Sequence, residues 1–328
     1  MKPSILITRS FFPELLEQLR PLYDLMVWEK DSPPEKKWLL QHIGAADALI
    51  CMLTDKIDQE VIAHGAAGRL KVVSQMAVGF DNIDVQSASQ LKIPVGNTPG
   101  VLTETTADFA WALLMAIARQ VITSQNEVQR GLWRPWGPEV FAGADVYGKT
   151  LGVIGYGRIG QAVARRATGF GMNVLVYSPG KTATDSDKVN PEFTNLEDLL
   201  RRSDFVTLHA NLNERSRGLI GSNELAFMKP GAFLINTARG AMLDHNALYK
   251  ALKAQKLAGA ALDVFDPEPI PHNHPLLSLP NVIITPHIAS ASLSTRRRMA
   301  EMTIENALAG LAGTRLPYCV NPEVYGGQ

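Results

Sequence analysis

Three polar residues with complementary chemistry follow three consecutive strand-like runs in the second half of the chain. Arg239 follows AFLIN, Glu268 follows GAALDV, and His287 follows NVIIT. An arginine side chain binds a carboxylate or a carbonyl oxygen. A protonated histidine donates a proton. A nearby carboxylate raises the pKa of that histidine and so keeps it charged. Each residue alone has an ordinary structural explanation. Placed together at strand exits, they favour hydride transfer to a 2-keto acid with His287 as general acid.

A glycine-rich turn lies in the middle of the chain, in the stretch LGVIGYGRIGQAVARR. Gly155 permits a tight strand-to-helix turn, Gly157 allows the backbone to approach a pyrophosphate, and Gly160 allows helix and strand to pack closely. The helix that starts at Arg158 and Ile159 presents free N–H groups to phosphates. A GxGxxG motif between a strand and a helix therefore predicts a dinucleotide site.

The segment after the next strand predicts which dinucleotide binds. It reads NVLVYSPGKTAT, and no acidic residue appears before Asp185. An acid at this point would favour NAD through the ribose hydroxyls. Ser178 can instead hydrogen-bond a 2′-phosphate, and Lys181, with Arg158, can neutralise it. We expect NADP(H) to be preferred and NAD(H) to be possible. The alternative is that Ser178-Pro179-Gly180 is only a turn and that the enzyme accepts either cofactor.

Elements that would position these residues alternate between strand and helix along the chain. The first hundred residues contain strand-like runs at 5–8, 48–53, 71–76 and 93–97, separated by the helical patterns PELLEQLR, PEKKWLLQHI and DQEVIAHGA. A long helix is expected over 103–127. A second series of strands is expected at 151–155, 173–177, 204–209, 232–236, 259–264 and 281–285. Its helix starts include a capping box of Thr194 with Glu197 and a cap at Asp244.

The pattern predicts an α/β fold with two doubly wound parallel-sheet domains. About forty residues follow His287, too few for a third domain, and they contain the helical pattern STRRRMAEMTIENALAGL. We therefore expect a Rossmann dinucleotide-binding domain, 100–288, inserted into a flavodoxin-like substrate domain formed by 1–99 and 289–328.

Composition narrows the classes of partner. The 328 residues contain 32 Lys+Arg and 32 Asp+Glu, so neither nucleic acid nor an acidic membrane is an expected partner. Cys51 and Cys319 form no ligand motif, so no metal is expected. The most apolar stretch, FAWALLMAIA, is too short to span a bilayer. A cytoplasmic protein is expected.

Several longer segments resemble the D-isomer-specific 2-hydroxyacid dehydrogenases, in particular glyoxylate/hydroxypyruvate reductases and 2-ketogluconate reductases. The matching segments extend over nearly the whole chain: VVSQMAVGFDNID, NTPGVLTETTAD, GKTLGVIGYGRIG, FMKPGAFLINTARG, AGAALDVFDPEP and HPLLSLPNVIITPHIASAS. The resemblance implies a catalytic set of Arg239, Glu268 and His287, with Arg239 and His287 also contacting the substrate.

The resemblance also implies further binding residues. The backbone N–H groups of Val78 and Gly79 would meet the substrate carboxylate. Asp263 would face the nicotinamide carboxamide, and Thr237 and Ala238 would pass beneath the ring.

Two further expectations concern the oligomeric state of the protein and its alternative functions. The resemblance implies a homodimer with the 103–127 helix at its interface. Trp136 would then either reach the partner's active site or pack in the interface. An NAD-linked D-lactate or phosphoglycerate type of dehydrogenase remains an alternative, as does a non-enzymatic, dinucleotide-sensing corepressor-like protein. The identity of the 2-keto acid is left open.

Overall fold

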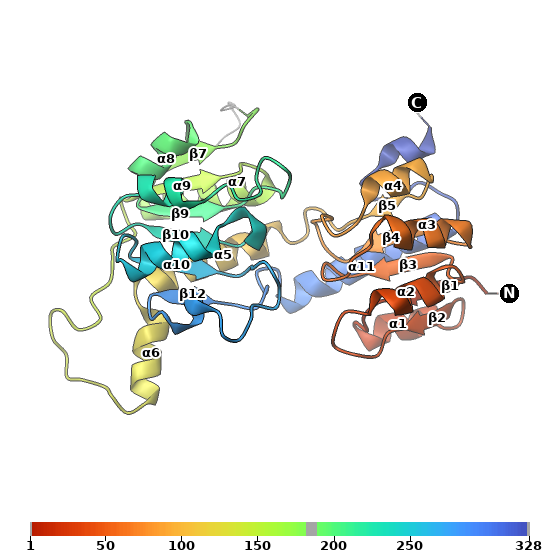
Figure 1. Cartoon of the computed structure of the whole chain (residues 1–328), viewed down its shortest axis with the longest axis horizontal. Helices are drawn as coiled ribbons and strands as arrows, with labels where there is room; N and C mark the ends of the chain where they lie inside the picture. Colours follow the sequence, from red (N-terminus) through yellow and green to blue (C-terminus); the bar gives the residue numbers. More distant parts are fainter. Residues whose placement is uncertain (1, 182–188, 327–328) are drawn as a thin grey trace. The chain divides into compact units, whose positions relative to one another are not determined.

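The computed structural model describes residues 2–181 and 189–326 and divides into two compact units. Unit 1 comprises Met1–Leu102 and Ser292–Gln328, and unit 2 comprises Thr103–Ala291. In Figure 1 the C-terminal helix α11 lies among the N-terminal elements of unit 1. The chain therefore leaves unit 1, builds unit 2, and returns.

Unit 1 contains a parallel five-stranded sheet in the order β2-β1-β3-β4-β5. The strands are β1 (Ser4–Ile7), β2 (Asp24–Val27), β3 (Ala48–Cys51), β4 (Val72–Gln75) and β5 (Val95–Gly96). The helices are α1 (Pro13–Leu19), α2 (Lys36–Ile43), α3 (Gln59–Ala67), α4 (Val85–Gln90) and α11 (Leu293–Leu311), followed by the 3-10 turn η4 (Pro322–Tyr325). Every residue of β1, β3 and β4 is buried, as expected for a sheet covered on both faces.

Helix α11 completes unit 1 by packing on β3, β4 and β5. A Cβ at Gly310 would lie 2.4 Å from the side chain of Val72, so this glycine allows the helix to approach β4 closely. The Ser74 hydroxyl on β4 donates to the carbonyl of Thr303 on α11 over 2.8 Å. The expected helix in this segment is therefore present, and it covers one face of the unit 1 sheet.

Unit 2 contains a parallel seven-stranded sheet in the order β12-β11-β10-β9-β6-β7-β8. The strands are β6 (Thr150–Ile154), β7 (Asn173–Tyr177), β8 (Glu192–Phe193), β9 (Phe205–Leu208), β10 (Phe233–Asn236), β11 (Gly259–Leu262) and β12 (Val282–Ile284). The order reverses between β6 and β9, which is the point where doubly wound sheets bind ligands.

Helices cover both faces of the unit 2 sheet. They are α5 (Thr103–Ala118), α6 (Val121–Gln129), α7 (Arg158–Ala167), α8 (Leu196–Arg202), α9 (Ser222–Phe227) and α10 (His245–Lys253), with 3-10 turns η1 (Thr168–Phe170), η2 (Gly240–Met242) and η3 (Pro275–Ser278). One apolar core gathers residues of α5 and α7, and a second gathers residues of α8, α9 and α10. The predicted fold class, two α/β units with parallel sheets, is confirmed.

Some expected elements differ in detail. Strands β2 and β8 were not predicted. The helix expected over 103–127 is two helices, because Gln120 adopts a left-handed conformation with φ 53° that ends the helical run. The expected cap at Thr194 is wrong: Asn195 caps α8 by accepting from the N–H of Asp198 over 2.9 Å. The cap at Asp244 is confirmed, since its carboxylate accepts from the N–H groups of Asn246 and Ala247.

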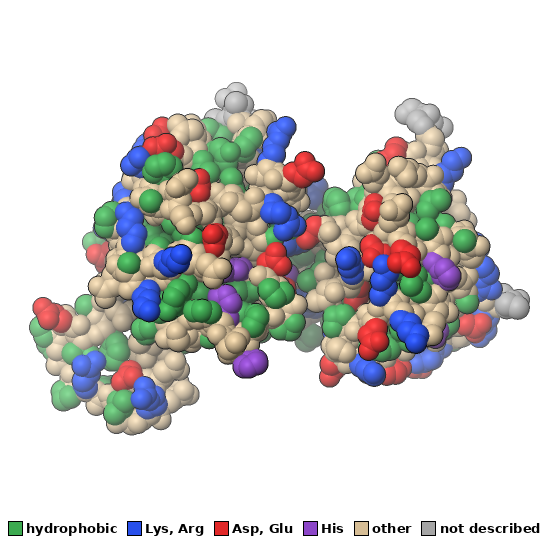
Figure 2. All heavy atoms as spheres, in the orientation of Figure 1, with side chains coloured by type: hydrophobic (Ala, Val, Ile, Leu, Met, Phe, Trp, Pro, Cys, Tyr) green, Lys and Arg blue, Asp and Glu red, His purple; other side chains and the backbone are tan. Residues whose placement is uncertain are grey.

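The surface charges and the helices of the two units are those of an ordinary globular protein. On the face drawn in Figure 2, basic and acidic side chains are interspersed on each unit. No helix within the described ranges 2–181 and 189–326 is long and apolar enough to cross a membrane.

Candidate active site

The carboxyl ends of β11 and β12 bring Glu268 and His287 together. Nδ1 of His287 lies 2.8 Å from Oε2 of Glu268, and each side chain is about a quarter exposed (25% and 26%). Oε1 of Glu268 accepts from the N–H of Phe265 over 2.8 Å. Because both carboxylate oxygens are engaged, the carboxylate is held in place and fixes the imidazole ring through Nδ1.

The pKa of Glu268 is lower than its ordinary value. Burial alone would raise this pKa, but the hydrogen bond and charge of His287, the N–H of Phe265 and the charge of Arg239 together outweigh it. Glu268 is therefore ionised near neutral pH and places a negative charge beside the imidazole.

A left-handed backbone presents His287. Its φ is 56°, a conformation that a residue with a Cβ adopts rarely and at a cost of order 1 kcal/mol or more. The surrounding contacts are centred on Asp263, which is 1% exposed. Its carboxylate accepts from the Thr285 hydroxyl (2.6 Å) and from the N–H groups of Ile288 (2.9 Å) and Ala289 (2.8 Å). Asp263 thus holds the residues on both sides of His287.

The loop after β10 carries Arg239 next to the same pair. Asn236 spans this loop, because its amide donates to the carbonyl of Arg239 and its oxygen accepts from the N–H of Ala238, each over 3.0 Å. A Cβ at Gly240 would lie 1.9 Å from the carbonyl carbon of Phe265, so only glycine allows this close approach. The approach places the Arg239 loop against the loop that carries Glu268.

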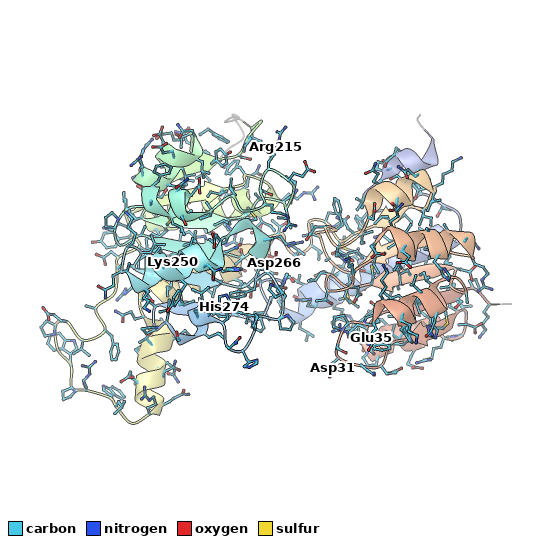
Figure 3. The ribbon with its side chains drawn as sticks, viewed as in Figure 1. Asp31, Glu35, Arg215, Lys250, Asp266 and His274 are labelled. Atoms are coloured by element: carbon cyan, nitrogen blue, oxygen red, sulfur yellow. The ribbon has the colours of Figure 1, made fainter. Side chains whose placement is uncertain are left out.

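Strand topology explains why these loops meet. Strands β10, β11 and β12 are neighbours and run parallel, so their carboxyl ends share one edge of the sheet. Arg215 and Asp266, which follow β9 and β11, lie on the same side of unit 2 in Figure 3. The three residues singled out in the sequence therefore lie at one edge of one sheet.

The glycine-rich turn between β6 and α7 lies at the point where the strand order reverses. A Cβ at Gly155 (φ 92°) would lie 2.5 Å from the nitrogen of Ala210, and one at Gly160 would lie 2.0 Å from the carbonyl oxygen of Gly155. Packing within the chain therefore requires both of these glycines. A Cβ at Gly157 would meet no described atom within 4 Å, which leaves open space beside the start of α7 for a phosphate.

The segment after β7 lies beside that turn. Lys181 donates from Nζ to the carbonyl of Tyr156 over 2.8 Å, so its charge lies against the glycine-rich turn. Lys181 and Arg158 are exposed, and Ser178 is partly exposed. Asp185, the first acid after β7, lies outside the described residues. These groups fit the 2′-phosphate of an NADP.

Thr237 and Ala238 follow β10 and are largely buried, with exposed fractions of 8% and 9%. Oγ1 of Thr237 is buried, and no described group hydrogen-bonds to it. A buried hydroxyl without a partner is unusual in a folded protein. It therefore fits a position that a bound dinucleotide would cover.

Val78 and Gly79 belong to unit 1, in the loop after β4. The carbonyl of Ala77 accepts from the N–H of Thr98 (2.9 Å), and that of Val78 accepts from the amide of Asn97 (2.8 Å). In a trans peptide the N–H points opposite to the carbonyl. The N–H groups of Val78 and Gly79 therefore both point away from segment 97–98, as two donors to one carboxylate would.

Two buried polar residues at strand ends, Gln75 and His209, were not singled out from the sequence. Gln75 fixes the carbonyl of Gly79 through its amide (3.0 Å). His209, at the end of β9, is buried, and burial lowers its pKa to about 3, so the ring is neutral at ordinary pH. In the sequence, the only indication of these residues is that each is a polar residue at the end of a strand. Many residues with a purely structural role have the same position.

The segment that contains Trp136 projects from unit 2. Figure 1 shows α6 and the loop after it extending away from the sheet. No residue of α6 is buried, and Trp133 and Trp136 are 78% and 89% exposed. Exposed aromatic side chains of this extent in one segment are typical of an interaction surface.

Comparison with known proteins assigns the family. Residues 111–289 match the sequence model of the D-isomer specific 2-hydroxyacid dehydrogenase NAD binding domain. A glyoxylate reductase of Korarchaeum cryptofilum is 50% identical over 99% of this chain and 97% of its own length. The chain belongs to the D-isomer specific 2-hydroxyacid dehydrogenase family and is an oxidoreductase, as the sequence motifs predicted.

Solved structures agree over nearly the full length. A protein of Thermus thermophilus superimposes with a TM-score of 0.90 at 44% identity, covering 97% of this chain and 99% of the other. An NADPH-dependent glyoxylate/hydroxypyruvate reductase of Sinorhizobium meliloti, solved with NADP and malonate, gives a TM-score of 0.84 at 28% identity and covers 98% of each chain.

Proposed function

We propose that the protein is an NADPH-preferring 2-keto acid reductase in which His287 is the general acid. The observation that carries the proposal is the 2.8 Å contact between His287 and Glu268 at the strand edge that also presents Arg239. Because Nδ1 is engaged by Glu268, proton delivery falls to Nε2. Glu268 orients the ring and offsets its charge.

Substrate binding is assigned to donors suited to a keto acid. The Arg239 guanidinium binds the substrate and polarises its carbonyl as negative charge develops on the oxygen. The N–H groups of Val78 and Gly79 bind the carboxylate. Names of relatives support glyoxylate and hydroxypyruvate as substrates, and 2-ketogluconate is the third candidate from the sequence.

The cofactor site is assigned to one continuous set of residues in unit 2. The residues proposed to hold the dinucleotide are Gly155, Gly157, Arg158, Ile159, Gly160, Ser178, Lys181, Thr237, Ala238 and Asp263. When bound, the reduced nicotinamide supplies the hydride. Ser178 and Lys181 bind the 2′-phosphate, because a hydroxyl and an ammonium group both favour a phosphate. Asp263 has a further duty, since its contacts hold the His287 loop.

Replacing His287 tests the proposed acid. His287→Ala is expected to lower turnover of glyoxylate by a factor of about 10² to 10⁴, which is the usual contribution of general acid catalysis. NADPH affinity, measured by fluorescence titration, is expected to change little. Equal losses of turnover and NADPH affinity would count against an acid role. A matched His42→Ala variant, in helix α2 of unit 1, should change neither quantity.

We further propose that the protein is a homodimer in which the exposed segment of each copy packs on the other. Apolar residues of α6 and the following loop are uncovered, including Ile122, Leu132 and Trp133. Next to α6 a groove of about 490 Å³ is lined by apolar residues that include Ile117, Phe233 and Ile283. Each chain carries both an apolar groove and an exposed apolar segment. Two copies of the chain can therefore cover each other's apolar surfaces.

Light scattering after size exclusion tests this assembly. The double variant Ile122→Lys with Trp133→Glu should elute as a monomer while the wild type elutes as a dimer. A monomeric wild type at micromolar concentration would refute the proposal.

A further inference from the structure

Phe265, which follows β11, connects the two loops that carry Arg239 and Glu268. Its N–H donates to Oε1 of Glu268 over 2.8 Å. Its carbonyl carbon lies against Gly240, the neighbour of Arg239, where a Cβ would be only 1.9 Å away. Phe265 itself is 8% exposed. A displacement of Phe265 would therefore disturb the carboxylate of Glu268 and the Arg239 loop together.

Two histidine rings pack against the ring of Phe265. The ring centroid of His245, the first residue of α10, lies 5.2 Å from that of Phe265, and the centroid of His274 lies 6.4 Å from it. The two imidazoles meet edge to face with their centroids 6.0 Å apart. These three rings form an aromatic cluster beside the residues that hold Glu268, and the proposed function makes no use of either histidine.

The surroundings of His245 suit a neutral imidazole and not a charged one. Its Nε2 is buried, and no described group hydrogen-bonds to it. An N–H at this atom of a protonated ring would be a charged donor without an acceptor, which is costly in a buried position. Burial lowers the pKa of His245, and the neighbouring His274 lowers it further.

The charged groups that act on His245 come from three elements. Asp244 precedes it at the start of α10, Asp266 follows β11, and His274 precedes η3; the last two are labelled in Figure 3. The two carboxylates act to raise the pKa of His245 but do not outweigh burial. The guanidinium of Arg217 lies 3.7 Å from the carboxylate of Asp266 and offsets part of its charge. The aromatic cluster therefore favours the neutral form of His245.

From this arrangement we infer that His245 is a positioning residue for the Glu268–His287 pair, which it supports through Phe265 only while its own imidazole is neutral. The inference rests on the proposed function and adds an acid limit to it. Protonation puts a charge without an acceptor into the aromatic cluster, so the ring of His245 moves toward solvent and Phe265 loses its support. Glu268 then loses the N–H at Oε1 and no longer fixes the imidazole of His287.

The pH dependence of kcat separates His245 from the proposed acid. His287 must be protonated in order to donate, so acidification does not remove the acid. The pKa of Glu268 lies below its ordinary value of 4.5, and that of His245 lies below its ordinary value of 6.5. A loss of kcat between pH 6.5 and pH 4.5 therefore reports a third group, which the inference identifies as His245.

The assay measures kcat at saturating glyoxylate and NADPH, so that only groups in the complex contribute to the profile. Between pH 7.5 and pH 4.5 the wild-type value should fall at least about threefold. His245→Phe keeps a ring in the aromatic cluster but cannot gain a proton, so the midpoint of its acid limb should lie at least about one pH unit lower. His245→Ala removes the ring and should lower kcat at pH 7.5 about tenfold with little change in NADPH affinity.

Two further variants and a reversibility check keep the experiment decisive. His272→Phe, which replaces an exposed histidine of the same segment, should leave the midpoint of the acid limb unchanged. His245→Gln is also uncharged and should lower the midpoint if His245→Phe does not fold. Rates are measured directly after a jump from pH 7.5, and kcat should be regained on return, because a loss that persists is unfolding and would count against the inference.

The outcomes for the positioning role and for the proposed function are distinct. A wild type without an acid limb above pH 4.5, or a midpoint that His245→Phe or His245→Gln leaves in place, would overturn the role of His245. Wild-type kcat in His245→Ala at pH 7.5 would do the same. Failure of the wild type to reduce glyoxylate or hydroxypyruvate with NADPH would instead overturn the proposed function, and the inference with it.

Discussion

Gly157→Ala should separate cofactor binding from folding. In the structure a Cβ at this position meets no described atom within 4 Å, and Gly157 has an ordinary φ of −81°. Alanine at a helix N-cap costs at most about 1 kcal/mol relative to glycine, which for a unit of this size lowers the melting temperature by about 4 °C or less. The affinity for NADPH should fall at least about tenfold, equivalent to about 1.4 kcal/mol, because the new methyl group occupies the space assigned to the pyrophosphate.

Two other glycines of unit 2 provide the comparison. Gly160→Ala puts a Cβ 2.0 Å from a backbone oxygen, so it should destabilise the fold by at least about 2 kcal/mol. Gly169→Ala also meets no described atom and lies away from the turn, so it should change neither stability nor affinity. Thermal unfolding without cofactor and fluorescence titration with NADPH give both quantities. Wild-type NADPH affinity in Gly157→Ala would refute the assignment of this turn to the pyrophosphate.

Three further predictions concern the selector and two titrating groups. Ser178→Asp should lower the ratio of kcat/KM with NADPH to that with NADH at least about tenfold; an unchanged ratio in steady-state assays would remove Ser178 from the selector. Asp204 has a lowered pKa, because Lys229 (2.9 Å) and a backbone N–H outweigh the effect of burial. Asp204→Asn should therefore be less stable than wild type in urea at pH 7, and the gap should close as the pH falls below about 4; a gap independent of pH would contradict this. The pKa of His209 is about 3 in the folded state, compared with an ordinary value of 6.5. Between these two pH values the unfolded state binds one proton more than the folded state. The free energy of unfolding therefore falls by up to about 1.4 kcal/mol for each pH unit of acidification. His209→Gln should flatten that slope between pH 6 and 5 in guanidinium unfolding, and equal slopes would show that His209 is protonated in the folded state.

Strand and helix alternation was sufficient to predict the layers of the fold. Every interior strand was assigned in advance, because an interior strand reads as a continuous apolar run when both faces of the sheet are covered. The strand missed in unit 1, β2, is an edge strand whose residues are only partly buried or exposed. Its sequence, DLMV, carries too weak an apolar signal to stand out from a loop.

Local backbone conformations that depend on tertiary contacts could not be predicted from the sequence. The break after α5 depends on the left-handed Gln120, and glutamine carries no preference for that conformation. The left-handed His287 is similar, because its φ is sustained by contacts that Asp263 makes across the strand end. Asp263 was expected to face the nicotinamide, but its position in GAALDVF gives no indication that it also holds the next strand's loop.

Two features of the packing of unit 2 support the assigned cofactor site. Gly155 and Gly160 are explained by packing within the chain, whereas Gly157 is not. Oγ1 of Thr237, in the same unit, is buried without a described hydrogen-bond partner. A fold selected for stability alone would pair this hydroxyl, because an unpaired buried polar group is unfavourable. Gly157 and Thr237 follow β6 and β10 at the carboxyl edge of the unit 2 sheet, so a ligand bound at this edge accounts for both positions.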